Sequence, residues 1–345
     1  MVRSASVLAL LAGVLALAAC GSSSPGDGSA SATPGANAAA GAEEAAFPAT
    51  VEHRFGSTTV ASAPKRVVVV GLREQDALLA LGIDPVGTTE WLGDRPGAIF
   101  PWAEAALGGR PLPTKLGFTD GIEFEKVAAL RPDLILAIYS GLSKKDYATL
   151  SKIAPTIAQP RGQVDWGSSW QDELTMTAKA VGKPKLGARL RAQAAARLAA
   201  AAKAHPEFQG QTAVVATPYE GLYVYGPQDA RTRLLVSLGF TFPSALDDVG
   251  SDDFGGPLSE EKADLLDVGA LLWFADPAPA AKLRAQPYYA PLKVHKQGRD
   301  IFIPERGTLY EATSFISVLS IPYLIDHLVP KLAAAADGDP ATPTA

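Results

Sequence analysis

Arginine and aromatic side chains follow several apolar runs that have the length and composition of β-strands. Arg73 comes shortly after the four valines at residues 67–70, and Tyr139 follows the apolar run at residues 134–138. In open α/β sheets, ligands bind beyond the carboxyl ends of the strands. Aromatic rings supply rigid apolar contact, and arginine donates charge-assisted hydrogen bonds to oxygen atoms. The pattern predicts a cleft for a large, oxygen-rich ligand.

The first half of the chain offers further candidates of the same two types. Trp91 and Arg95 follow a predicted strand at residues 86–88, and Trp166 lies in the loop before a predicted helix at residues 171–181. Each has an ordinary alternative, because a tryptophan can belong to the core and an arginine can be a solvated surface side chain. Trp102 and Trp170 are expected to pack inside the fold rather than face the cleft.

The second half of the chain also offers aromatic and arginine side chains as candidates. Tyr223 and Tyr225 alternate in a predicted strand and therefore share one face. Arg231 lies near the start of the next predicted helix, where the helix dipole disfavours a cation, so an anionic neighbour is expected; a solvated arginine is the alternative. The predicted ligand-binding residues are Arg73, Trp91, Arg95, Tyr139, Trp166, Tyr225, Arg231, Trp273, Arg306 and Tyr310.

Residue types that would indicate catalysis or a bare metal site are scattered or missing. The four histidines (His53, His205, His295 and His327) have no helical ligand spacing, and Met176 is the only methionine after Met1. The body contains no nucleophile elbow, phosphate-binding loop or dinucleotide fingerprint. The sequence therefore predicts no catalytic residue, no metal ligand and no cofactor. It also lacks the basic stripe of a nucleic-acid-binding protein.

These candidates need two sheets to position them, and the sequence divides accordingly. The chain has 345 residues, which suits two domains better than one. Residues 186–205 are rich in Ala, Leu and Arg and predict one long helix that ends at Pro206. The segments EKVAALRPDLILA and EKADLLDVGALLW, one on each side of this helix, resemble each other. We therefore expect two α/β lobes, residues 50–185 and 206–335, joined by a connecting helix.

The N-terminus has the composition of an export signal. Residues 1–20 combine Arg3, a short apolar run and the sequence LAAC, which looks like a bacterial lipobox ending at Cys20. Residues 21–49 predict a flexible tether, and residues 336–345 a disordered tail. Cys20 is the only cysteine, so no disulfide can form within the chain.

Six segments, taken in order, resemble one known family. They are PKRVVVVGLREQDALLALGIDPVG, FEKVAALRPDLILAIYSG, SKIAPTIAQ, DWGSSWQDELTMTAKAVG, VYGPQDARTRLLVSLGF and SIPYLIDHLVP. Each is weakly specific alone, but together they cover nearly the whole predicted mature chain and resemble the iron–siderophore substrate-binding lipoproteins of ABC importers. The resemblance implies a helical-hinge periplasmic binding protein fold, with two Rossmann-like lobes, a connecting helix and a shallow cleft between the lobes.

The resemblance also implies partners. It predicts a monomer that is lipid-anchored through Cys20 to the outer face of the bacterial cytoplasmic membrane, captures a ferric siderophore and delivers it to an ABC importer permease. In this family one surface glutamate per lobe pairs with permease arginines, and Glu125 and Glu261 match that pattern best. Both could instead simply stabilise a helix N-terminus. Cobalamin or haem as the ligand, a surface enzyme, and an adhesin or sensor remain alternatives.

Overall fold

The computed structural model describes residue 43 and residues 46–249 and 253–339. The predicted signal peptide with Cys20, most of the predicted tether and the last six residues lie outside these ranges. The first described strands form an antiparallel hairpin, β1 (Ala49–His53) and β2 (Gly56–Val60), in which Val51 is opposite Thr58.

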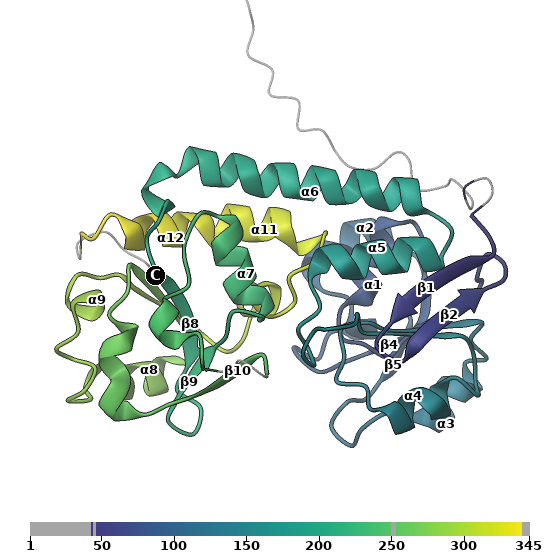
Figure 1. Cartoon of the computed structure of the whole chain (residues 1–345), viewed down its shortest axis with the longest axis horizontal. Helices are drawn as coiled ribbons and strands as arrows, with labels where there is room; N and C mark the ends of the chain where they lie inside the picture. The colour runs from purple at the N-terminus through teal and green to yellow at the C-terminus, as the bar shows by residue number, and fades with distance from the viewer. Residues whose placement is uncertain (1–42, 44–45, 250–252, 340–345) are drawn as a thin grey trace, which may run out of the picture. The chain divides into compact units, whose positions relative to one another are not determined.

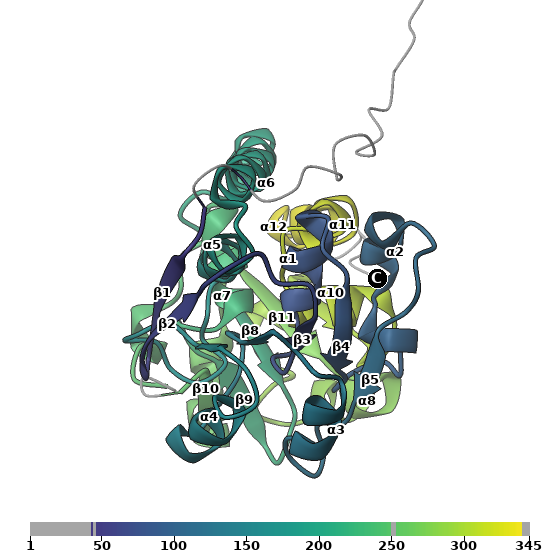
Figure 2. The ribbon, with the colours of Figure 1, turned by 90° about the vertical axis from the view of Figure 1, so that its right-hand side faces the viewer.

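The first lobe is built on a parallel sheet with the strand order β5-β4-β3-β6-β7. Its strands are β3 (Val67–Val69), β4 (Pro85–Thr89), β5 (Thr114–Leu116), β6 (Leu134–Ala137) and β7 (Thr156–Ala158). Its helices are α1 (Glu74–Ala80), α2 (Pro101–Leu107), α3 (Phe124–Ala129), α4 (Lys144–Leu150) and α5 (Trp170–Ala180), with a short 3-10 turn η1 (Pro96–Ala98). The valines of β3 are fully buried because α1 and α5 cover one face of the sheet, while α3 and α4 cover the other (Figure 2).

The second lobe has a mixed sheet with the order β10-β9-β8-β11-β12, in which β8, β11 and β12 are parallel and β9 pairs antiparallel with both β8 and β10. Its strands are β8 (Ala213–Thr217), β9 (Leu222–Tyr225), β10 (Gly255–Leu258), β11 (Ala270–Phe274) and β12 (Asp300–Ile303). Its helices are α7 (Ala230–Ser237), α8 (Pro277–Arg284), α9 (Lys293–Lys296), α10 (Thr308–Ser314), α11 (Ser320–His327) and α12 (Val329–Ala336). Three 3-10 segments complete it: η2 (Pro206–Phe208), η3 (Ser244–Leu246) and η4 (Glu260–Leu266).

One long helix, α6 (Pro184–Ala204), leads from the first lobe to the second (Figure 1). It begins with proline, which is favoured in the first turn because its missing N–H would be unpaired there in any case. The helix packs on α5 of the first lobe and on α11 and α7 of the second. The predicted fold, two α/β lobes joined by one long helix, is therefore confirmed.

The chain returns to the first lobe near its C-terminus. The sequence predicts one helix over residues 314–328, with Pro322 as an irregularity, and this is wrong. Instead, α10 ends at Ser314 and α11 begins at Ser320, so that Pro322 lies in the first turn of a new helix, where its missing N–H costs little. In the intervening turn the Phe315 ring lies 5.2 Å from that of Phe100. Residues 315–319 therefore form a second connection between the lobes.

Candidate ligand-binding site

A groove of about 440 Å³ lies where loops of the two lobes meet. The first lobe contributes the loop of residues 162–166 and Arg54, and the second contributes Gln228, Asp253 and Phe254. Its lining combines aromatic rings with charged and amide side chains, as in small-molecule sites, where a few polar groups orient the ligand. Of the predicted ligand-binding residues, Trp166 lines this groove directly.

Four aromatic side chains form the first-lobe wall. The Trp166 ring lies 5.6 Å from Phe118 and 5.9 Å from Tyr139, and Trp91 lies 6.3 Å from Phe118. All three contacts are edge-to-face, a favoured geometry for aromatic pairs. The structure thus brings the predicted residues Trp91, Tyr139 and Trp166 together. Trp91 is 51% exposed, so it is a surface aromatic and not the core residue of the alternative reading.

The backbone of Trp166 is strained. Its φ is +61°, in the left-handed region that residues other than glycine rarely adopt. The indole lies so close to Gly141 that a Cβ there would be 3.1 Å from Nε1. Strained residues of this kind cluster at binding sites, where the surrounding structure holds them in place. The strain and the glycine contact together fix the direction of the indole.

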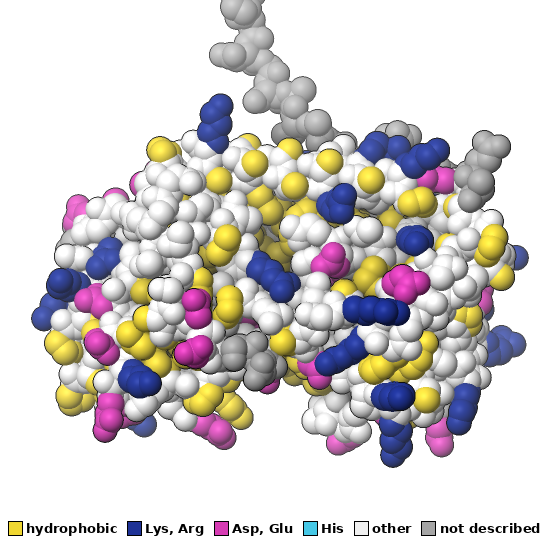
Figure 3. Space-filling model, viewed as in Figure 1, with side chains coloured by type: hydrophobic (Ala, Val, Ile, Leu, Met, Phe, Trp, Pro, Cys, Tyr) yellow, Lys and Arg dark blue, Asp and Glu magenta, His cyan; other side chains and the backbone are white. Residues whose placement is uncertain are grey.

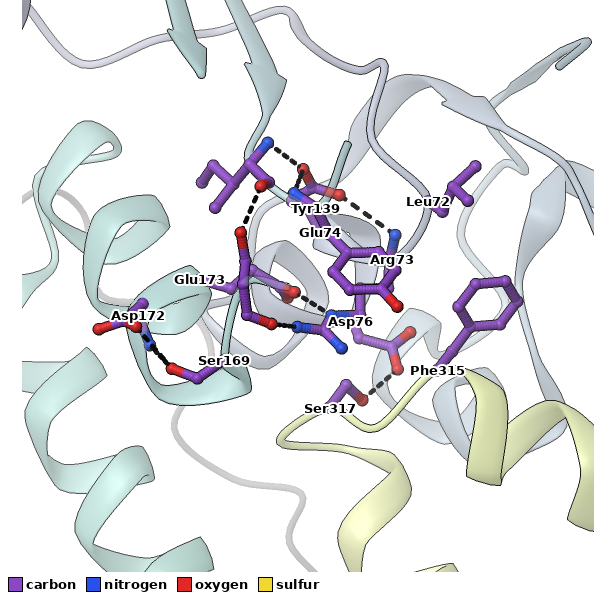
Figure 4. Close-up of polar contacts among 12 residues, drawn as sticks. Leu72, Arg73, Glu74, Asp76, Tyr139, Ser169, Asp172, Glu173, Phe315 and Ser317 are labelled. Carbon is purple, nitrogen blue, oxygen red and sulfur yellow. Dashed lines mark hydrogen bonds and ion pairs between the residues drawn. The ribbon is translucent and has the colours of Figure 1, made fainter. Parts of the chain in front are cut away.

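Arg73 lies behind this wall rather than in the groove, which corrects the expectation that it contacts ligand. It is fully buried, and its guanidinium carbon lies 3.8 Å from the centre of the Tyr139 ring. Its Nε donates to the Glu173 carboxylate and one terminal nitrogen donates to the Ser168 carbonyl (Figure 4). Burial raises the pKa of the Glu173 carboxyl, and the positive charge of Arg73 opposes that shift. Arg73 is therefore a support for Tyr139.

Two further buried acids, Glu74 and Asp76, hold the groups behind the first-lobe wall in place. The buried Glu74 carboxylate accepts hydrogen bonds from the backbone N–H groups of Ile138 and Tyr139, the latter at 2.9 Å (Figure 4). Asp76 accepts hydrogen bonds from the Ser317 hydroxyl and, at 2.6 Å, from the Trp102 indole. Burial raises the pKa of Asp76 to about 6. Trp102 thus packs inside the fold as predicted, and so does Trp170, which is 8% exposed.

The second-lobe wall joins three predicted residues. Tyr225 and Tyr310 lie on two sides of Phe274, at 5.9 Å and 5.0 Å between ring centres. The Arg231 guanidinium carbon lies 4.2 Å from the centre of the Tyr225 ring. Burial raises the pKa of the Tyr225 hydroxyl, and the Arg231 charge opposes that shift.

Arg231 has the anionic neighbour that its helix position predicts. Asp229 is the N-cap of α7, and its carboxylate accepts from the Arg231 backbone N–H and from Nη1, both at 2.8 Å. Among the described residues, Arg231 Nε has no hydrogen-bond partner although it is buried. The Arg231 charge also acts on Tyr139 of the first lobe, lowering the pKa of a hydroxyl that burial raises more strongly. The Arg231 charge is therefore close enough to the first-lobe wall to influence Tyr139.

Two contacts cross between the lobes beside the walls. Arg95 donates through Nε at 3.0 Å and Nη2 at 2.8 Å to the two oxygens of Glu311 on α10. Arg233 on α7 donates to the carbonyl of Gly167, next to Trp166. The Arg95 guanidinium, predicted to contact ligand, is thus paired with a carboxylate of the other lobe in this structure.

Two predicted residues do not join either wall. Trp273 is fully buried in the core of the second lobe, and its Nε1 donates to the Tyr289 hydroxyl at 2.9 Å, which corrects the expectation that it faces the cleft. The expectation fails because alternate side chains of a covered strand point to opposite faces, and the next residue, Phe274, is the one that packs against Tyr225 and Tyr310. Arg306 lies on the loop after β12, with an 81% exposed side chain paired to Asp276 at 2.7 Å.

Several site residues escaped the sequence analysis. Phe118 follows the exit of β5, and the rule that found Tyr139 would have found it had that short strand been recognised. Phe274 could have been found by the same alternation that excludes Trp273. Phe254 lies in an irregular loop beside Tyr223 and Tyr225, and no sequence pattern marks it.

The remaining predicted residues lie elsewhere. Glu125 is exposed in the first turn of α3, and Glu261 is exposed in the first turn of η4. Within the described ranges, no cluster of His, Cys, Asp and Glu could hold a metal ion. No helix in that part of the chain has the length and apolar character needed to cross a bilayer.

Comparison with known proteins gives consistent matches. A family model described as periplasmic binding protein matches residues 67–305. A putative ABC transporter substrate-binding lipoprotein of Bacillus subtilis, YhfQ, is 42% identical over 135 residues, which cover 39% of this chain and 40% of that relative. The chain thus spans about two-fifths of the length of this curated relative.

Solved structures match over a longer range. A periplasmic solute-binding protein from Mycobacterium smegmatis is 35% identical with a TM-score of 0.73, and the match covers 84% of this chain and 98% of that one. PiaA of Streptococcus pneumoniae, solved in complex with ferrichrome, is 29% identical with a TM-score of 0.74, covering 84% and 99%.

Proposed function

Because the chain belongs to the periplasmic binding protein family, we propose that it is an extracytoplasmic receptor that binds a ferric siderophore between its lobes and delivers it to an ABC importer. The observation that carries the proposal is the groove between the lobes, which is lined by Trp166 of one lobe and Phe254 of the other, each packed against further aromatic rings. PiaA, similar over most of this chain, is described in complex with the iron chelate ferrichrome. The alternatives with cobalamin or haem as the ligand are outcomes of the test below.

In this proposal the protein contacts the organic shell of the chelate, and iron stays coordinated by the siderophore. Aromatic faces at Tyr139, Trp166 and Tyr225 supply apolar contact, and Arg231 Nε donates to a chelate oxygen. No side chain is assigned to iron or to catalysis. The receptor therefore acts by binding and release alone.

The pairing of the arginines bears on the charge of the ligand. Arg95, Arg231 and Arg306 are each paired with a carboxylate, so the two walls hold little uncompensated positive charge. A cleft rich in arginine, as predicted from the sequence, suits anionic catecholate or citrate chelates, but hydroxamates also offer acceptor oxygens. With the partners in view, we propose that a chelate of low net charge, such as a ferric hydroxamate, binds better than a highly anionic one.

Closure around the ligand is proposed to be small. The lobes are joined by α6 and again by the segment of residues 315–319, which Ser317 ties to Asp76 of the first lobe. Two separate connections resist wide hinge bending more than a single flexible linker does.

A tryptophan-fluorescence titration tests the binding proposal. Ferric hydroxamates, ferric catecholates and ferric citrate are compared with their iron-free forms, and cobalamin and haem serve as controls. Saturable quenching by an iron-loaded siderophore, lost in Trp166→Phe but kept in Trp170→Phe, supports the site. Saturation by cobalamin or haem alone would mean that this compound, and not a siderophore, is the ligand. No response from any ligand would overturn the proposal.

Delivery is tested by the two predicted docking glutamates. Glu125→Ala combined with Glu261→Ala should abolish uptake of the iron-loaded ligand by cells while its affinity for the purified receptor stays unchanged. The matched control changes two other exposed acids, Glu104→Ala with Asp326→Ala. Equal loss of uptake in the control pair, or lost affinity in the test pair, would contradict the docking role.

The membrane anchor belongs to the proposal as well. We expect Cys20→Ser to release the receptor from the membrane fraction while ligand binding is unaffected. A variant that remains in the membrane fraction would contradict lipidation at Cys20.

A further inference from the structure

The connecting helix α6 has an unusual charge. Its 21 residues include five cations (Lys185, Arg189, Arg191, Arg197 and Lys203) and no aspartate or glutamate. The whole chain, by contrast, has a net charge of −5 at neutral pH. A helix of one charge sign within an acidic protein is a local feature that the fold itself does not require.

All five cations are exposed, and none is paired with a carboxylate of the described residues. The buried residues of α6 are limited to Gly187, Ala194, Leu198 and Ala201, which form one narrow stripe toward the lobes. At 3.6 residues per turn, Lys185, Arg189 and Lys203 lie on the side opposite that stripe, and alanines fill most of the positions between them. Figure 3 shows hydrophobic and basic side chains along the edge where α6 runs. The outer face of α6 is therefore cationic and covered by small side chains.

The start of the chain's described part is tied to this same helix. The Glu43 carboxylate accepts from the backbone N–H groups of Lys185 at 3.0 Å and Leu186 at 2.9 Å, and the Glu43 N–H donates to the Gly182 carbonyl at 2.8 Å. Glu43 thus caps the N-terminus of α6 from 142 positions before Lys185 in the chain. Cys20 precedes Glu43 by 23 residues, so the proposed anchor is within about 80 Å of this end of α6 even when that segment is fully extended.

We propose that the outer face of α6 rests on the anionic phospholipid headgroups of the membrane that anchors the receptor. The proposal depends on the lipid anchor of the proposed function. An exposed helix face with several Lys and Arg and no acid is complementary to a negatively charged leaflet. The anchor holds that face near the surface, so that weak contacts suffice to orient the body.

The proposed contact has a consequence for transport. Figures 1 and 2 both place α3, which carries Glu125, at the edge of the first lobe opposite α6. A receptor resting on α6 thus holds its proposed docking glutamate away from the membrane. Electrostatic contacts at an exposed surface are weak and screened by salt, so the resting receptor can detach and turn toward a permease.

Lysine footprinting of the lipidated full-length protein tests the proposal. The protein is reconstituted in phosphatidylcholine vesicles with or without phosphatidylglycerol and treated briefly with an amine-acylating reagent. Lys185 and Lys203 should be acylated on the order of five-fold more slowly in the anionic vesicles, because headgroups cover them. Lys144 and Lys145, exposed on α4, are the internal reference and should react equally in both. Added salt should remove the difference.

A charge-reversed variant sharpens the test. Arg189→Glu with Arg197→Glu should abolish the slower acylation of Lys185 and Lys203, whereas the matched pair Lys144→Glu with Lys145→Glu should not. Unchanged rates in anionic vesicles, or protection of Lys144 and Lys145 as well, would overturn the proposal. Vesicle flotation and ligand quenching on the same sample report separately on the anchor and on binding, so failure of the proposed function is distinguishable.

Discussion

Arg73 lies 3.8 Å from the centre of the Tyr139 ring in the first lobe, and Arg231 lies 4.2 Å from that of Tyr225 in the second. Each pair puts a guanidinium against a tyrosine that belongs to a wall of the groove, and each arginine is paired with a buried carboxylate. The two arginines differ in how far they are exposed. Arg73 is fully buried, whereas Arg231 is 8% exposed and its charge also lowers the pKa of Tyr139 in the other lobe.

The comparison shows that residue type does not decide whether an arginine binds ligand. Arg73 is fully buried and its environment holds three acids: Glu74, Asp76 and Glu173. Both arginines retain a buried nitrogen with no hydrogen-bond partner in the described chain, Nη1 of Arg73 and Nε of Arg231. Arg231, however, is 8% exposed and has a single carboxylate partner, Asp229. Full burial makes the first arginine a support for its wall, whereas we expect the second to donate to the ligand.

Removing the supporting arginine should have the largest effect. Arg73→Ala leaves the Glu173 carboxylate buried without its cation, which is expected to lower the free energy of unfolding by about 3–5 kcal/mol. Urea denaturation measures the loss. Arg73→Met with Glu173→Gln, which removes both charges and keeps the volume, should recover much of it. A small loss in Arg73→Ala would contradict the supporting role.

The acids behind the first wall predict a pH dependence of stability. Because burial raises the pKa of Asp76 to about 6, the folded state binds a proton at Asp76 more tightly than the unfolded state does. Ionisation of Asp76 should therefore lower the free energy of unfolding by about 3 kcal/mol as the pH rises from 4 to 6. Burial also raises the pKa of Glu74 and Glu173, so the fall continues above pH 6.

Asp76→Asn cannot ionise and should make the fall between pH 4 and 6 smaller by about 3 kcal/mol, while Asp326→Asn on the surface of α11 should leave it unchanged. Urea denaturation between pH 4 and 7 measures both. A fall of unchanged size in Asp76→Asn would assign it to the other buried acids.

A conservative change at Arg231, which lies against Tyr225 in the second lobe, should affect ligand binding and not folding. Arg231→Lys keeps the positive charge near Asp229 but loses the planar guanidinium and its Nε donor. Affinity for the iron-loaded ligand should fall about ten-fold with little change in melting temperature, because one charge-assisted hydrogen bond is removed. The same substitution at Arg73 should lower the melting temperature instead. Unchanged affinity in Arg231→Lys would remove Arg231 from the site.

The Arg95–Glu311 ion pair, which crosses between the lobes, should contribute least to the free energy of unfolding. Arg95 is partly exposed, with 31% of its side chain accessible, so its interaction with Glu311 is expected to be worth about 1 kcal/mol or less. A double-mutant cycle with Arg95→Gln and Glu311→Gln measures this coupling energy. A coupling of several kcal/mol would make the pair a major determinant of lobe closure rather than a minor one.

The sequence by itself determined the architecture. The four valines before Arg73 and the apolar run before Tyr139 predict strands covered on both faces, and an alanine-rich stretch whose interior lacks proline, such as α6, predicts a helix. These are local properties of composition and period. They also made Tyr139 and Trp166 candidates, because ligands bind beyond strand ends, and the structure brings these two rings together.

Only the tertiary structure decided which of these side chains face the groove. Trp273 and Phe274 are neighbours on one strand, and only the packing on the two faces of the sheet determines that Phe274, and not Trp273, joins Tyr225 and Tyr310. The carboxylate partners Glu173 and Glu311 lie 100 and 216 positions from their arginines. No local pattern encodes such long separations, because burial and ion pairing depend on which elements the fold brings together. Burial and ion pairing are what distinguish an arginine that supports the site from one that can bind a ligand.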